Sequence, residues 1–169
     1  MTHPWLARYP AGVAAEIGST PPPLSLVELL DESTARHADA TAYRFLGRGF
    51  SFKEIDKASR ALAAWLQAKG LKRGDRVAVM MPNIPQYPVA VRAVLRAGCV
   101  VVNVNPLLAG RELELLLKDA GAQAIVVLES QAATLQATLP RVPVHTIVIA
   151  AMGDMLGPIK RGLVNYLER

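Results

Sequence analysis

The stretch VLRAGCVVVNVNPLLAGRELELLLKDAGAQAIVVLE, residues Val94–Glu129, carries the pattern that decides the fold. It reads as the end of a helix, a glycine, an apolar strand, an Asn-Pro turn, a second helix, a second glycine and a second apolar strand. Helices and strands that alternate in this way predict a wound α/β unit. Such units usually bind ligands at the carboxyl ends of their strands. The stretch nevertheless contains no glycine-rich phosphate loop, no catalytic triad and no metal cluster.

The same alternation continues on both sides of this stretch. We expect helices separating four apolar strands, at residues 76–81, 99–104, 123–128 and 145–150. Because these strands are continuous apolar runs, the predicted fold is α/β, with a wound, largely parallel sheet covered by helices on both faces. After the first strand, Asn83 is the expected cap of a helix through Ala97, and Pro88 is expected to distort that helix.

The first fifty residues combine an arm, a helix and a hairpin. Residues 1–23 contain five prolines and predict an extended surface arm. Ser25 with Glu28, and Ser51 with Glu54, form capping boxes that predict the starts of two helices. Between these helices, two short strands around Gly47-Arg48-Gly49 predict a β-hairpin. The predicted division is the arm at 1–23, an α/β subdomain at 24–150, and a linker with an amphipathic helix at 151–169.

The last residues have helical apolar spacing. The apolar positions are Ile159, Leu163, Tyr166 and Leu167, and basic residues flank them. Two interpretations are open: a helix that rests on an anionic membrane, and an ordinary helix that packs on the domain, which is the favoured one. Because the pattern runs to the end of the sequence without a glycine or proline after Leu167 to stop it, we expect this sequence to be part of a longer chain.

The composition fits one globular domain or a large part of one. The chain has 169 residues, of which 51% are hydrophobic and 20% charged. No apolar run approaches the roughly 18 residues of a membrane span, and the first residues do not resemble a signal peptide. One cysteine excludes an internal disulfide framework. We therefore expect a cytoplasmic protein, with the inner membrane face as the alternative.

The positive charge does not predict nucleic-acid binding. The formal net charge is +5 and the pI is about 9.7, but the cations are spread along the chain and aromatic residues make up only 5%. We interpret the charges as solvated faces, including an acidic one formed by Asp31, Glu32 and Asp39. No nucleic acid is expected as a partner.

No single residue stands out as a catalyst. His3, His37 and His145 lie far apart in the sequence, so no metal site is predicted. Cys99 opens a buried strand and is interpreted as a packing residue. Gly47-Arg48-Gly49 lacks the third glycine of a nucleotide loop.

Four stretches carry a resemblance to a known family. They are WLARYP (5–10), FSFKEIDKASRALAAWL (50–66), GDRVAVMMPNIPQYPVAVRAVLRAGCVVVNVNPL (74–107) and RELELLLKDAGAQAIVV (111–127). In this order they resemble the N-terminal part of bacterial long-chain fatty acid–CoA ligases, which are members of the AMP-forming acyl-adenylating superfamily. The resemblance implies that the chain is a piece of the large N-terminal domain of such an enzyme.

The resemblance also explains the missing chemistry. In this family a later Ser-, Thr- and Gly-rich loop ending in Lys cradles the ATP phosphates, and no stretch here matches it. The parent enzyme is expected to use ATP, Mg and CoA on a long-chain fatty acid. The chain alone is expected to bind none of these cofactors, to contain no catalytic residue, and to dimerise or aggregate through uncovered surfaces.

One departure from the family concerns the turn after Asn105-Pro106. Relatives often place Ser or Thr with Pro before REL, whereas this chain has Ala109-Gly110, so the N-cap hydroxyl is lost. Arg111 follows in the first turn of the helix. By resemblance, CoA approaches the enzyme on this side, and Arg111 is a candidate contact for a CoA phosphate. The alternative is that Arg111 pairs with Glu112 or Glu114 on an exposed helix.

Two other function classes remain open. The first is a stand-alone binding or regulatory module without catalysis. The second is a compact nucleotide-binding domain of the Rossmann type, against which the missing glycine fingerprint argues.

Overall fold

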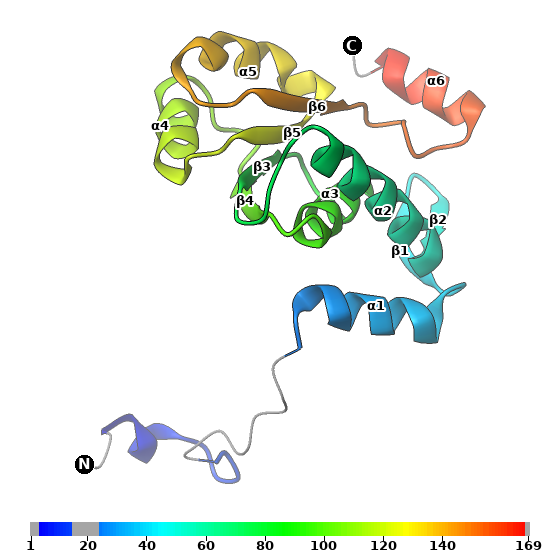
Figure 1. The fold of residues 1–169 in the computed structure, drawn as a ribbon. Coiled ribbons are helices and arrows are strands. Elements are labelled where there is room, and N and C mark those ends of the chain that lie inside the picture. The colour runs from blue at the N-terminus through cyan, green and yellow to red at the C-terminus, as the bar shows by residue number, and fades with distance from the viewer. Residues whose placement is uncertain (1–3, 15–23, 168–169) are drawn as a thin grey trace.

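The computed structural model describes residues 4–14 and 24–167 (Figure 1). Helices and strands alternate through most of this range, which confirms the α/β class. The main elements are α1 (Leu26–His37), β1 (Thr41–Phe45), β2 (Arg48–Ser51), α2 (Phe52–Ala68), β3 (Arg76–Met80), α3 (Gln86–Arg96), β4 (Val100–Val104), α4 (Gly110–Ala120), β5 (Ala124–Leu128), α5 (Ala132–Thr138), β6 (Thr146–Ala150) and α6 (Pro158–Leu167).

The four predicted apolar strands form one parallel sheet in the order β4-β3-β5-β6. Their bounds lie within one residue of the predicted ones. Helices α2 and α3 cover one face, and α4 and α5 cover the other. Two covered faces require apolar side chains at successive positions, which is why these strands lack the polar alternation of a half-exposed sheet.

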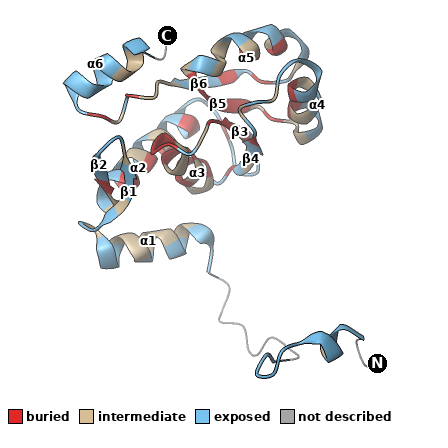
Figure 2. Cartoon of the chain, turned by 180° about the vertical axis from the view of Figure 1, so that it is seen from behind, coloured by how far each residue is buried: buried red, intermediate tan, exposed pale blue. Residues whose placement is uncertain are grey.

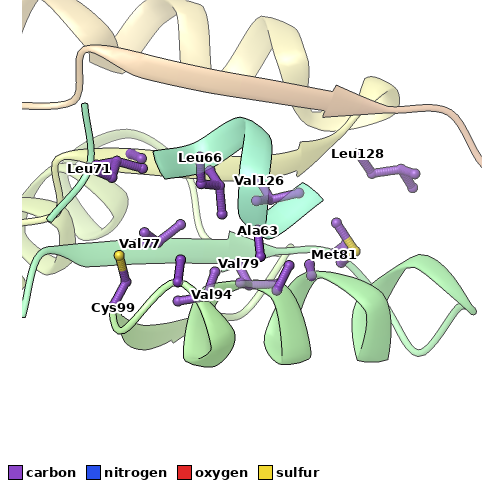
Figure 3. Close-up of a cluster of buried hydrophobic side chains, with 14 of the residues drawn as sticks. Ala63, Leu66, Leu71, Val77, Val79, Met81, Val94, Cys99, Val126 and Leu128 are labelled. Carbon is purple, nitrogen blue, oxygen red and sulfur yellow. The ribbon is translucent and has the colours of Figure 1, made fainter. Parts of the chain in front are cut away.

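Alternate residues of each strand enter different cores. Val77 and Val79 of β3 pack against Leu66 and Val94 on the α2–α3 side (Figure 3). The residues between and beyond them, Ala78 and Met80, pack on the α4–α5 side. The fully buried helix residues there are Leu113, Leu117 and Leu135. Figure 2 shows how the buried residues concentrate along the central strands.

The last strand of the sheet is less well covered. Ile147 and Ile149 of β6 pair in register with Ile125 and Val127 of β5, so they face the α4–α5 side. Ile149 is nevertheless 57% exposed. The β6 edge of the sheet therefore presents apolar surface in the described part of the chain.

The predicted hairpin is confirmed as a separate two-stranded sheet. Strands β1 and β2 pair antiparallel, and the residues between them, Leu46 and Gly47, have φ of 46° and 76°. Positive φ at both turn residues matches the twist of a tight hairpin, and glycine adopts it without strain.

Local cap signals predicted several helix ends correctly. In both capping boxes the serine Oγ accepts the backbone N–H of the glutamate, from Glu28 to Ser25 and from Glu54 to Ser51, each at 3.2 Å. At the other end of α4, Gly121 has φ +60° and forms the left-handed C-cap.

Two predictions were wrong: one concerned the start of α3, and the other concerned the arm. Helix α3 begins at Gln86 after an N-cap at Pro85, so Asn83 does not cap it. Pro88 therefore falls in the first turn, where a missing N–H leaves no helical hydrogen bond unmade, and it need not distort the helix. Residues Pro4–Arg8 form a 3-10 helix instead of an extended segment. The predicted extension at 15–23 lies outside the described residues.

Helix α6 lies beside the hairpin. Its Val164 packs with Phe50 and Leu156, and Lys160 Nζ donates to the backbone oxygen of Leu46 at 3.2 Å. The side chains of Ile159 and Leu163 remain exposed. Of the helices in the described residues, none combines the length and the apolar character needed to cross a membrane.

Candidate functional site

The strand order places a topological switch point between β3 and β5. The chain leaves β3 through α3 on one face, and it leaves β5 through α5 on the other face. A crevice at the carboxyl ends of such strands is the usual ligand site of an open parallel sheet. The connections that border this edge are residues 81–85, 105–109, 129–131 and 151–157.

The connection from β4 to α4 is shaped by its own residues. The side-chain Oδ1 of Asn105 accepts the N–H of Leu107 at 2.9 Å, and the backbone oxygen of Asn105 accepts the N–H of Leu108 at 3.0 Å. Ala109 is the N-cap and offers no side-chain hydrogen bond. As the sequence indicated, this helix lacks a cap hydroxyl, and α4 begins at Gly110.

Gly110 has a backbone conformation that favours glycine. Its φ is +54°, in the left-handed region. The first turn of α4 carries backbone N–H groups that no capping side chain satisfies. Partial positive charge therefore accumulates at this end of the helix, on the carboxyl edge of the sheet.

Arg111 projects from that first turn and is exposed. Within the described residues its side chain forms no hydrogen bond or ion pair. The alternative pairing with Glu112 or Glu114 is absent: the carboxylate of Glu114 accepts from Lys118 Nζ at 2.7 Å and from Arg141 Nε at 2.6 Å. The structure thus leaves the Arg111 guanidinium available, and it supplies no ligand that would assign it a role.

The first turn of α3 is held to its neighbours at the same edge. Gln86 Nε2 donates to the backbone oxygens of Ala151 and Met152, at 2.8 and 3.1 Å. The hydroxyl of Tyr87 donates to Oδ1 of Asn103 at 3.0 Å. These contacts fix the loop after β6 and the exposed end of β4 relative to α3.

The structure shows the surroundings of Cys99, His37 and His145, which the sequence analysis considered one by one. No group of three or more His, Cys, Asp or Glu side chains suited to a metal ion occurs in the described ranges 4–14 and 24–167. Cys99 is buried, as expected of a packing residue, and burial raises the pKa of its thiol. His37 lies near the ring of Phe52, and His145 contacts Thr146.

Sequence reasoning missed a partly buried charge cluster between α1, α2 and α3. We call it the arginine cluster; its members are Asp31, Asp56, Arg60, Arg92 and Arg96. Asp56 contacts all three arginines, at 2.7 to 3.3 Å. The interpretation of Asp31 as part of a solvated face was wrong, and so was that of Arg92, which is 6% exposed.

The cluster shifts the pKa values of its members. The hydrogen bond from Arg96 lowers the pKa of Asp31, and the same bond raises the pKa of Arg96. Burial lowers the pKa of Arg92, against the opposing attraction of Asp56. A spacing of four residues between Asp56 and Arg60, and between Arg92 and Arg96, was the only signal of the cluster in the sequence.

A protein-family model matches most of this chain. The model described as AMP-binding enzyme matches residues 30–160. The long-chain-fatty-acid–CoA ligase of Escherichia coli O157:H7 is 47% identical over 98% of this chain. The enzyme of the same name from Bacillus subtilis strain 168 is 44% identical over 75% of it. The chain spans 29% of the length of the first relative and 22% of the second.

Solved structures share the fold. A long-chain-fatty-acid-CoA ligase from Archaeoglobus fulgidus superposes with a TM-score of 0.70 at 23% identity, covering 86% of this chain and 30% of that one. A benzoate CoA ligase from Burkholderia xenovorans superposes with a TM-score of 0.69 at 22% identity, covering 82% and 28%. At this identity the two structures support a shared fold and nothing further.

Proposed function

The chain belongs to the AMP-binding enzyme family, and from that membership we propose that it is the N-terminal part of an AMP-forming long-chain fatty acid–CoA ligase. In the proposed reaction, a fatty acid and ATP give acyl-AMP and diphosphate, and CoA then takes the acyl group and releases AMP. The observation that carries the proposal is the high identity to long-chain ligases along almost the whole chain.

Within that enzyme, the proposed role of these residues is structural support. The sequence has no Ser-, Thr- and Gly-rich loop ending in Lys, which is what a phosphate cradle would need. The complete enzyme is proposed to use ATP, Mg and CoA, whereas the 169 residues alone bind none of them. Catalytic groups then come from other parts of the enzyme.

The test compares the complete protein with the chain of residues 1–169. The complete protein should catalyse ATP–pyrophosphate exchange that depends on a long-chain fatty acid such as palmitate, and should form palmitoyl-CoA when CoA is added. The short chain should do neither. Exchange by the short chain would contradict the assignment of a supporting role, and a complete protein without exchange would contradict the ligase assignment.

We further propose that Arg111 contacts a CoA phosphate in the complete enzyme. Its free guanidinium and the uncapped N-terminus of α4 both favour an anion at this edge. Replacement by alanine should raise KM for CoA about tenfold, equivalent to about 1.4 kcal/mol, and leave KM for ATP and fatty acid unchanged. Arg73→Ala is the matched control, because Arg73 is exposed in the connection that precedes β3 at the opposite edge. An unchanged KM for CoA would refute the contact.

The remaining proposals concern organisation and surroundings. We propose the division into an arm (1–23), a subdomain (24–150) and a linker with α6 (151–169).

The enzyme is proposed to be cytoplasmic, with peripheral membrane contact through the exposed apolar side of α6 beside Lys160 and Arg161. Co-sedimentation with anionic vesicles, lost on Ile159→Glu, would support that contact. A homodimer is the last proposal, and light scattering of the complete protein tests it.

A further inference from the structure

Residues 69–76 connect the end of α2 to β3 and concentrate positive charge at the amino edge of the sheet. Asp75 is the one acidic residue of this stretch. The cations, all of them exposed, are Lys69, Lys72, Arg73 and Arg76. We call these four residues the amino-edge patch. The patch and Arg111 lie at opposite edges of the sheet, because Arg111 follows the carboxyl end of β4.

The charged groups of this patch lack partners. Within residues 4–14 and 24–167, none of the four side chains forms a hydrogen bond or an ion pair. The carboxylate of Asp75 instead accepts the backbone N–H of Lys72 at 2.7 Å and Nε2 of Gln123 at 3.0 Å. Cations that are concentrated in this way create a positive potential that attracts anionic partners.

The neighbouring connections do not compensate the charge. The other connections at the amino edge are residues 97–99, 121–123 and 142–145, and none of them contains an acidic residue. The added Cβ of an alanine at Gly98 would lie 3.5 Å from the side chain of Arg73, and one at Gly121 would lie 4.0 Å from Nη1 of Arg76. The patch therefore extends over the glycines on both sides of β3.

The backbone that carries the patch is held in place. Gly74 donates to the backbone oxygen of Gly98 at 2.9 Å, and Val100 donates to that of Asp75 at 2.8 Å. Leu71 is buried in the core on the α2–α3 side, together with Cys99 (Figure 3). Because the connection is already ordered, a partner that binds the four cations does not have to order their backbone, which lowers the cost of binding.

The surface beside the patch suits a polypeptide. Trp65 of α2 is 39% exposed, and Lys69 Nζ lies 5.3 Å from the centre of its ring. The exposed residues on the same side of α2 are Ala61, Ala64 and Ala68. Small side chains let another backbone approach closely, and tryptophan and arginine are the residues that most often anchor protein interfaces.

A bilayer fits this surface less well. A helix that lies on a membrane inserts large apolar side chains into the acyl boundary, whereas the exposed face of α2 beside the patch offers alanines and a single tryptophan. The same single aromatic residue is a poor platform for nucleic acid, which stacks successive bases on several rings.

We propose that the amino-edge patch and Trp65 bind an acidic segment of a partner protein. The carboxylates of the segment pair with the four cations, and its backbone lies along the alanine face of α2 beside Trp65. This surface is separate from the carboxyl edge of the sheet, and the proposal does not depend on the proposed ligase reaction.

The experiment measures the binding of an acidic peptide to the complete protein. The probe is a fluorescein-labelled peptide of about ten glutamates, followed by fluorescence anisotropy at about 50 and 300 mM NaCl. The peptide should bind at the lower salt concentration and weaken steeply at the higher one, since exposed charges are screened. Absence of binding to the folded complete protein would overturn the proposal and would mean that another part of the protein covers the patch.

Paired variants test whether the patch itself binds the peptide. Lys72→Gln/Arg73→Gln should weaken binding about tenfold. The matched control is Lys53→Gln/Lys57→Gln, which removes the same charge from exposed positions in the first half of α2 and should change Kd less than about twofold. All four residues are exposed, so these changes should not unfold the protein. Equal losses in the two double variants would mean that only net charge matters, and would overturn the proposal.

Trp65→Ala keeps every cation and tests the contact with α2. It should weaken peptide binding about threefold while leaving the salt dependence unchanged. An unchanged Kd would remove α2 from the proposed surface. Phosphatidylglycerol vesicles and an oligodeoxythymidylate are the competing anions. If either bound as tightly as the peptide and lost binding in Lys72→Gln/Arg73→Gln, the assignment to an acidic polypeptide would be overturned.

Discussion

Arg96 and Asp31 form a two-point ion pair that joins α3 to α1. Arg96 Nη1 lies 3.1 Å from Asp31 Oδ2, and Arg96 Nη2 lies 2.5 Å from Oδ1. Helix α1 buries none of its residues, so apolar packing contributes little to holding it in place (Figure 2). Its position therefore depends on this pair, on the ion pair between Asp31 and Arg60 of α2, and on the bonds from Arg92 to Leu30 and Thr34.

Replacing Asp31 by asparagine should destabilise the protein by about 1 kcal/mol. The change removes a two-point acceptor from Arg96, but the side chain of Asp31 is 37% exposed, so water screens part of the loss. Urea unfolding of the complete protein measures the effect. Asp39→Asn is the control, since Asp39 is exposed and forms none of the ion pairs among the described residues. Equal midpoints for the two variants would contradict the prediction.

Stability should fall as the pH drops below about 4. The hydrogen bond from Arg96 lowers the pKa of Asp31, and the capping bonds from Ser25 and Ser51 lower those of Glu28 and Glu54. A carboxyl group with a lowered pKa in the folded state stabilises the fold above its unfolded pKa and loses that contribution as the pH falls through the folded pKa. Thermal melting between pH 3 and 7 measures the slope. In Asp31→Asn the slope should be shallower, and an identical slope would exclude Asp31 as a contributor.

Gly110→Ala should cost about 1 kcal/mol through backbone strain alone. An added Cβ at Gly110 would meet no atom within 4 Å, so crowding is not involved, but φ is +54°. Gly157→Ala provides the comparison, because a Cβ there also meets open space and its φ lies outside the left-handed range. Thermal unfolding should separate the two variants, and similar melting temperatures would refute the strain.

Leu117→Ala should cost roughly 2–5 kcal/mol, because Leu117 is fully buried between α4 and the sheet. Leu115→Ala, two residues away on the same helix, should change stability by less than about 0.5 kcal/mol, since Leu115 is 54% exposed. Denaturant unfolding of both variants tests whether α4 has the predicted orientation. A larger loss for Leu115→Ala would mean that it faces the other way.

The features that sequence reasoning predicted correctly are those with a local cause. The serines at 25 and 51 meet their own glutamates three residues later, and Gly121 ends α4 through its backbone freedom. The apolar strands were recognisable because burial on both faces leaves continuous runs in the sequence. Asn83 does not cap α3, which begins only at Gln86, a residue whose side chain bonds to a loop 65 residues away.

The features that were missed depend on contacts between distant segments. Asp31 and Arg96 are 65 residues apart, and nothing in either neighbourhood specifies the other. The groove between α1, β1 and the N-terminal half of α3 likewise arises only when these elements meet. At the carboxyl edge, the sequence located the Asn105 turn and the missing cap, but whether Arg111 was paired depended on Lys118 and Arg141 occupying Glu114.

The order of the strands has a consequence for how the chain folds as it is synthesised. Strand β3 is made first among the four, yet it lies inside the sheet with β4 on one side and β5 on the other. Each later strand therefore finds an edge that an earlier strand has already provided: β4 and β5 pair with β3, and β6 pairs with β5. No pair has to open to admit a later strand. The sheet can grow outward in the direction of translation, with the slow closure of parallel pairs spread over successive steps.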